Sequence, residues 1–181
     1  MSQNPIVSGV AIASIGIAPN DDNVRAVGLN NGNVWRTING SSTLVNVTGD
    51  IPSFIVSRLA IDKNNNNIAY ATLSGFTTAG QGVWKTTNFL AVTPTWAASA
   101  TGIPSIPINA FVIDPRNSAN LYAGTDIGVY RSTDSGANWT AFSTGLPRTP
   151  VFDMAFQAAT LATGDQTLRI ATHGRGIWEF G

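Results

Sequence analysis

The residues that could do chemistry are few in this chain of 181 residues, which has ten acidic side chains, one histidine and no cysteine. Without cysteine the chain has no thiolate nucleophile, no thiolate metal site and no disulfide. His173 alone cannot build a multi-histidine metal centre, and no nucleophile-elbow motif surrounds a serine that it could activate. The remaining candidate chemistry is that of two facing carboxylates, as in glycoside hydrolysis.

The acidic residues follow a repeated pattern instead of gathering in one motif. Asp62 and Asp114 both end an apolar segment just before a polar turn, where aspartate commonly caps the turn. Asp134 lies in another turn, and Asn39 and Asn88 occupy the corresponding places. Asparagine can accept a turn's hydrogen bonds but cannot act as an acid. We therefore predict no catalytic residue and no metal ligand, and a protein that is not an enzyme.

One motif recurs four times and sets the organisation of the chain. A glycine is followed by one or two residues and then an aromatic side chain, and the four aromatic residues are 49, 46 and 48 residues apart: Trp35, Trp84, Tyr130 and Trp178. A repeat of this length indicates stacked or radially arranged copies of one supersecondary unit. The strands and turns that would position a functional site are therefore predicted from this repeat.

Each repeat contains up to four short segments with the composition of β-strands. An apolar strand, a polar turn, a second strand, the aromatic-bearing third strand and a short fourth strand follow one another. Four antiparallel strands in about 45 residues describe one blade of a β-propeller. The predicted fold is all-β, with a single propeller domain over residues 1–181 and blades at residues 14–52, 53–104, 105–147 and 148–181. A β-sandwich is the competing fold, although it would not need four copies of one motif.

The two ends of the chain do not match the repeat. The fourth repeat stops after its third strand, and an extra apolar stretch, residues 6–12, precedes the first repeat. Because an unpaired sheet edge is a liability, we expect residues 6–12 to supply the outer strand of the last blade. The alternative is a larger ring, completed by other sequence or by a second copy of the chain.

Composition excludes some classes of partner. Lysine plus arginine equals aspartate plus glutamate, and only 11% of residues are charged. No basic field exists to attract nucleic acid, and no apolar run is long enough to span a bilayer. The phosphate-binding motifs of nucleotide sites are absent from the sequence, so we predict no cofactor. The amide-rich, charge-poor composition favours an extracellular or cell-surface location.

Residues 132–139 read Ser-Thr-Asp-Ser-Gly-Ala-Asn-Trp. This stretch resembles the Asp-box of bacterial neuraminidase (BNR) repeats, and the last residues resemble the closing blade of secreted bacterial Asp-box propellers. The resemblance implies a turn between the third and fourth strands in which Asp134 accepts backbone hydrogen bonds. It further implies that the tryptophan packs against its own blade. The structural residues are then Ser132, Asp134, Gly136 and Trp139.

The same superfamily includes sialidases and xyloglucanase-like hydrolases. Sialidase activity needs a converging arginine cluster, whereas Arg36 and Arg131 share one repeat position with Lys85, which favours a structural or solvent-facing role. Xyloglucanase-type enzymes build their cleft between two propellers, of which this chain would supply half at most. Because fold does not fix activity, the resemblance is informative about fold and weak about function.

A propeller would present its ligand-binding residues on one face. The turns between second and third strands share that face with the connections between blades, and loops there tolerate functional insertions. The candidates form an aromatic and cationic set of the kind enriched in interfaces: Phe54, Phe76, Arg148, His173 and Arg175. Phe76 is the strongest of them, since it lies in an insertion that the other repeats lack.

These observations favour a non-catalytic interaction or scaffold module that binds a protein or a glycan through this face. One alternative is a structural subunit of an extracellular assembly, for which a homo-oligomer is expected. The other is a fragment of a xyloglucanase-like glycoside hydrolase.

Overall fold

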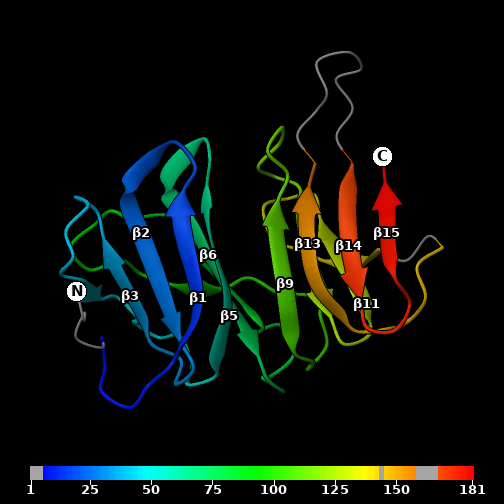
Figure 1. Ribbon diagram of the computed structural model, residues 1–181, viewed down its shortest axis with the longest axis horizontal. Coiled ribbons are helices and arrows are strands. Elements are labelled where there is room, and N and C mark those ends of the chain that lie inside the picture. Colours follow the sequence, from blue (N-terminus) through cyan, green and yellow to red (C-terminus); the bar gives the residue numbers. More distant parts are fainter. Residues whose placement is uncertain (1–5, 143–144, 158–166) are drawn as a thin grey trace.

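In the computed structural model, which describes residues 6–142, 145–157 and 167–181, every regular element is a β-strand. The strands form four separate antiparallel sheets, and each sheet is built from consecutive strands of the chain. The sheets succeed one another as blades around a common axis, with β1, β5, β9 and β13 innermost (Figure 1). The predicted all-β propeller is confirmed.

The first two blades each have four strands in the order of the sequence. Blade 1 contains β1 (Ile12–Ala18), β2 (Asp21–Leu29), β3 (Val34–Thr37) and β4 (Val45–Asn46). Blade 2 contains β5 (Ile55–Asp62), β6 (Asn65–Ser74), β7 (Val83–Thr86) and β8 (Ala97–Ala98). The outer strands β4 and β8 are only two residues long, shorter than the apolar patterns suggested.

Blades 3 and 4 differ in their number of strands. Blade 3 contains β9 (Ile108–Ile113), β10 (Leu121–Thr125), β11 (Gly128–Ser132) and β12 (Thr140–Phe142). Blade 4 contains β13 (Val151–Phe156), β14 (Leu168–Thr172) and β15 (Ile177–Phe180), a three-stranded sheet in the described residues.

The segment 6–12 does not complete blade 4 in this structure. Ile12 is the first residue of β1 and pairs with Leu29. The amide of Asn30 donates to the carbonyl of Ala11 at 3.0 Å, so the pairing with blade 1 continues one residue further back. The backbone of this segment is thus engaged at the inner hairpin of blade 1, and the remaining residues 6–10 form no strand.

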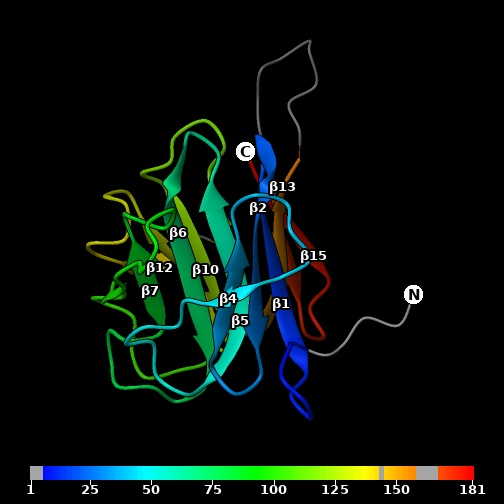
Figure 2. The same cartoon turned by 90° about the vertical axis from the view of Figure 1, so that its left-hand side faces the viewer.

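Successive blades pack face to face, which Figure 2 shows from the side of blade 1. The innermost strand β1 packs on β5, β5 packs on β9, and β9 packs on β13. Three buried clusters correspond to these interfaces: the first is centred on Val34, Leu59 and Trp84, the second on Tyr70 and Phe111, and the third on Tyr122 and Met154. The core therefore lies between blades.

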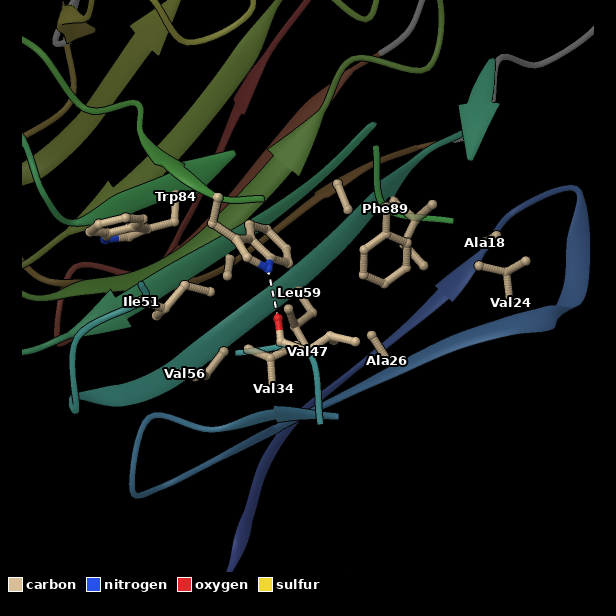
Figure 3. Close-up of a cluster of buried hydrophobic side chains, with 14 of the residues drawn as sticks. Ala18, Val24, Ala26, Val34, Val47, Ile51, Val56, Leu59, Trp84 and Phe89 are labelled. Carbon is tan, nitrogen blue, oxygen red and sulfur yellow. Dashed lines mark hydrogen bonds between the residues drawn. The ribbon is translucent and has the colours of Figure 1, made fainter. Parts of the chain in front are cut away.

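A tryptophan fastens each of the first two interfaces. The indole of Trp96 in blade 2 donates to the carbonyl of Val47 in blade 1 at 2.9 Å (Figure 3). The indole of Trp139 in blade 3 donates to the carbonyl of Ser99 in blade 2 at 2.7 Å. Both indoles are about 95% or more buried. The resemblance implied packing within one blade, whereas Trp139 bridges two.

A cation at a fixed repeat position adds a second contact. The side chains of Arg36, Lys85 and Arg131 each lie over an aromatic ring, at 5.2 to 5.6 Å from its centroid. Arg36 donates to the carbonyl of Ala91 in the next blade at 2.8 Å, and Lys85 donates to that of Ser135 at 2.9 Å. Burial lowers the pKa of Arg36 and of Lys85. These recurring cations are structural.

We predict that Trp139→Phe lowers the free energy of unfolding by about 1–3 kcal/mol, because the buried carbonyl of Ser99 loses its donor. Urea denaturation followed by fluorescence of the remaining tryptophans measures the change. Val92→Ala is the matched control, since Val92 is 94% exposed and its truncation should change stability by less than about 0.5 kcal/mol. Equal stabilities of the two variants would show that the indole does not fasten the interface.

Candidate functional site

The antiparallel order of each sheet gives the propeller two different faces. The connections between blades and the turns between each blade's second and third strands lie on one face, which we call the connecting face. The turns between first and second strands and between third and fourth strands lie on the other, which we call the turn face. The five predicted ligand-binding residues belong to the connecting face, and the 132–139 turn belongs to the turn face.

Two predicted residues lie at the connecting end of blade 2. Phe76 follows β6 in the insertion before β7, and its side chain is 73% exposed. Phe54 is half-buried and packs against the first buried cluster. A Cβ atom added to Gly75 would overlap the Phe54 ring, so the ring lies directly against this glycine. Phe54 therefore supports the loop, and Phe76 is presented to solvent.

The other three predicted residues lie in or beside blade 4. His173 is exposed, and its backbone is fixed at both ends: its amide donates to the carbonyl of Pro150, and its carbonyl accepts from Thr149 Oγ1, both at 2.9 Å. Arg175 is exposed, while its carbonyl accepts from the indole of Trp178. Arg148 is exposed and lines a separate hollow of about 250 Å³ beside blade 3.

Phe152 joins this group, although the sequence reasoning did not select it. Its ring is 53% exposed and lies edge-to-face with the imidazole of His173, with 5.4 Å between ring centroids. Arg58 reaches from β5 to β13 and donates to the carbonyl of Phe152 at 3.3 Å and to Asp153 at 2.9 Å. The sequence could have indicated Phe152, because an aromatic residue at the start of a blade, directly after the connection from the preceding blade, lies near the connecting face.

Four of the five predicted residues thus lie in two places, on blades 2 and 4, and Arg148 lies apart from them beside blade 3. Arg58 connects the innermost strands of these two blades, since it leaves β5 and binds β13. Phe76 follows β6 of blade 2, whereas Phe152 and His173 belong to blade 4. A ligand that used both groups would have to extend across the mouth of the propeller.

On the turn face, the 132–139 turn lies between β11 and β12. Asp134 Oδ1 accepts from Ser132 Oγ at 2.7 Å and from the amide of Asn138 at 2.9 Å, and Oδ2 accepts from the Asn138 side chain. These hydrogen bonds lower the pKa of Asp134 to about 2. Its carboxylate is consequently committed to the turn.

In the corresponding turns of blades 1 and 2, asparagine side-chain oxygens accept the hydrogen bonds that Asp134 accepts in blade 3. Asn39 Oδ1 accepts from Thr37 Oγ1 and from the amide of Ser41. Asn88 Oδ1 accepts from Thr86 Oγ1 and from the amide of Thr95. The alignment that placed these residues opposite Asp134 therefore matches the hydrogen bonding of all three turns.

The tight turn also has a backbone requirement. Ser135 and Gly136 adopt positive φ angles of 59° and 92°, and Ser135 is the sole non-glycine residue with positive φ in the described ranges. A Cβ atom at Gly136 would approach Ser99 Oγ to 2.5 Å. Gly136 is thus needed both for its conformation and for close approach to blade 2.

All four blades contribute to one apolar hollow of about 340 Å³ at the turn-face end of the inner strands. Ile17, Ile61, Ile113 and Phe156, one from each blade, occupy corresponding positions of the first strand in its lining. Sequence reasoning missed this feature, although the recurrence of a large apolar residue at this position was visible. The hollow could accommodate an apolar group, and Lys63 and Asp114 are the ionisable residues in its lining.

The two buried carboxylates that share a repeat position are held in turns. Asp62 Oδ1 accepts from the amide of Asn64 at 2.8 Å and from Ser118 Oγ at 2.7 Å. Asp114 Oδ1 accepts from the amide of Arg116 at 2.9 Å. Both are more than 90% buried, which leaves little access for a sugar or a water nucleophile.

Within the described residues, no three His, Cys, Asp or Glu side chains come together as they would around a metal ion. The same part of the chain contains no helix that is long and apolar enough to cross a membrane.

No protein-family model matches the chain, and no curated protein matches it. Solved structures with the same fold include the GH74 xyloglucanase from Xanthomonas campestris, which is 18% identical with a TM-score of 0.68 over 93% of this chain and 29% of that one. The GH74 enzyme of Niastella koreensis is 19% identical with a TM-score of 0.69, over 93% of this chain and 28% of that one. The chain thus spans less than a third of these enzymes.

The computationally designed Ika4 protein is also similar, at 13% identity and a TM-score of 0.65, and each chain is covered completely. These likenesses at low identity establish the propeller fold and carry no activity to this chain.

We predict that Asp134 makes the stability of the protein pH-dependent in acid. Its folded-state pKa, about 2, lies below the ordinary value of 3.8. The stabilisation is therefore complete above pH 4 and is lost as the pH falls through 2. Asp134→Asn should retain the turn, as Asn39 and Asn88 do, and flatten the pH profile of thermal unfolding between pH 4 and 2. An unchanged profile in this variant would contradict the assignment.

Proposed function

We propose that this chain is a non-catalytic binding module that recognises a protein or glycan partner through its connecting face. The proposed contact residues are Phe76 on blade 2 and Phe152, His173 and Arg175 on blade 4, with Arg148 at the rim and Phe54 supporting the loop. We further propose an extracellular or cell-surface location, on the basis of the low charge content.

The observation that carries this proposal is the exposure of two phenylalanines on one face. Phe76 and Phe152 are 73% and 53% exposed, yet the backbone around Phe152 is held by Arg58 and by the bonds of His173. Aromatic side chains on a fixed frame bind at a low entropic cost, and aromatic residues together with arginine dominate interface energetics.

Hydrolysis receives no comparable support from the described residues. The recurring acidic side chains are buried in turns or, in the case of Asp134, hydrogen-bonded through both oxygens. Retaining and inverting glycosidases both require two carboxylates that flank the bond to be cleaved. The likeness to GH74 enzymes nonetheless makes xyloglucan the first glycan to examine, for binding and for cleavage.

We predict that Phe76→Ala weakens partner binding by about thirtyfold, as expected for an interface hot spot of about 2 kcal/mol. Immobilised xyloglucan and a panel of other soluble polysaccharides serve as glycan probes, and release of reducing ends is measured in parallel. Arg175→Ala should weaken binding in the same assay, and Val92→Ala, at a site remote from this face, should not.

Retention without cleavage, reduced by Phe76→Ala, supports the proposal for a glycan partner. Cleavage of any glycan in the panel would overturn the non-catalytic assignment. If no glycan is retained, the wild type and the same three variants are used as baits for extracellular proteins, and a partner captured equally by wild type and Phe76→Ala would contradict the proposed face.

A further inference from the structure

Within the part of the chain that the structure describes, the first and last blades each leave one face uncovered. In blade 1 this face points away from blade 2 and carries Ile15 and Ile17, which are 62% and 50% exposed. In blade 4 it points away from blade 3 and carries Ile177, which is 73% exposed, beside Ala155 and Ala171. We call these the leading and the trailing face. In the described residues β1 packs on β5, and β13 packs on β9.

The repeat shows how the trailing face compares with a buried one. Ile177 directly precedes the aromatic residue of the recurring motif. Val34, Val83 and Val129 have the same place in the other three blades. These three valines are at most 1% exposed, because each packs under the next blade. Ile177 thus has the residue type of a buried blade interface, but no blade covers it among the described residues.

The leading face likewise carries exposed residues at repeat positions that are buried in other blades, where they pack on the preceding blade. Ile15 occupies the repeat position of Leu59, Phe111 and Met154, which pack on the preceding blade and are 6% to 8% exposed. Ile17 corresponds to Ile61, which is 5% exposed in the first buried cluster. Trp35 corresponds to Trp84, which packs in that cluster. Each face therefore presents the residues that would bury the other.

We propose that a second copy of this chain covers both faces. The trailing face of each copy packs on the leading face of its partner, and the two contacts close a two-chain ring. The contact joins two different surfaces, so repeating it gives either a closed ring or an open chain of copies. Two copies form a ring only if the rotation that relates them, applied twice, returns to the first copy. The chain supplies one surface of each kind, and a pair of chains uses all four.

Charge on the trailing face is compatible with this packing. In blades 2 and 3 an aromatic residue of the second strand pairs with a cation of the third strand. In blade 4 Arg169 has the place of the aromatic residue and Glu179 that of the cation, and the two form an ion pair at 2.7 Å. The contact engages Nε of Arg169. The Nη groups are then suited to donate to turn carbonyls of the partner's blade 1, as Lys85 donates to Ser135 within one chain.

One feature makes this interface weaker than the internal ones. Leu44 precedes β4 where Trp96 precedes β8 and Trp139 precedes β12. The leading face therefore lacks the indole that fastens the preceding blade, and association depends on burial of apolar surface. The dimer is expected to dissociate on dilution.

The test is the oligomeric state of the whole chain over a concentration series, by light scattering and native mass spectrometry. The wild type should form a dimer. Ile15→Asp and Ile177→Asp should each raise the dissociation constant by a hundredfold or more, because a carboxylate would be buried without a partner. Circular dichroism should remain that of the wild type, and thermal unfolding should match that of the wild type diluted to its monomeric range, since both residues are exposed in the single chain and association itself raises the unfolding temperature. Val92→Asp is the matched control and should still dimerise.

Mixing the two variants tests the head-to-tail arrangement. A mixed pair has one intact contact, between the trailing face of Ile15→Asp and the leading face of Ile177→Asp, so it should associate more strongly than either variant alone. A monomeric wild type, a dimer unaffected by either variant, open chains of more than two copies, or the absence of recovery on mixing would each overturn the proposal. These measurements need no ligand, so their failure is distinguishable from failure of the proposed partner binding.

Discussion

The structure depends on one constraint, which is that the blade faces inside the chain must be buried against the neighbouring blade. The internal faces satisfy it with aliphatic and aromatic residues at recurring positions, as Val34 and Val83 show. At the first two interfaces the indoles of Trp96 and Trp139 also donate a buried hydrogen bond to a carbonyl of the preceding blade. Since the buried clusters lie between blades, no blade has a core of its own, and the stability of one blade is inseparable from that of the next.

Much of the fold could be predicted because the repeat records it at every blade. The aromatic residues at Trp35, Trp84, Tyr130 and Trp178 gave the number of blades, and turn chemistry placed Asn39 and Asn88 opposite Asp134. Closure could not be predicted in the same way, because it occurs once and leaves no recurring pattern. Residues 6–12 have the composition of a strand, but composition does not decide between the edge of blade 4 and the inner hairpin of blade 1. Pairing of Ile12 with Leu29 decides it.

The candidate site was less accessible to sequence reasoning for a related reason. Loop residues such as Phe76 could be assigned to the connecting face from topology, but the depth of a side chain within a loop depends on packing. Phe54 lies against Gly75 and is half-buried, whereas Phe152, on the first strand of its blade, is exposed beside His173. The apolar hollow required residues from all four blades to be placed around one axis, which no single segment of the sequence specifies.

The distribution of charge connects these points to function. The chain has few ionisable residues, and many of them are engaged in structure: Asp62, Asp114 and Asp134 in turns, and Arg36, Lys85 and Arg131 over aromatic rings. General acid and base catalysis needs groups that are accessible and free to exchange protons, and turn capping removes that freedom. Recognition by exposed aromatic residues has no such requirement. Asp62, Asp114 and Asp134 are held in turns while Phe76 and Phe152 face solvent, and this contrast is what supports the proposed binding role over bond cleavage.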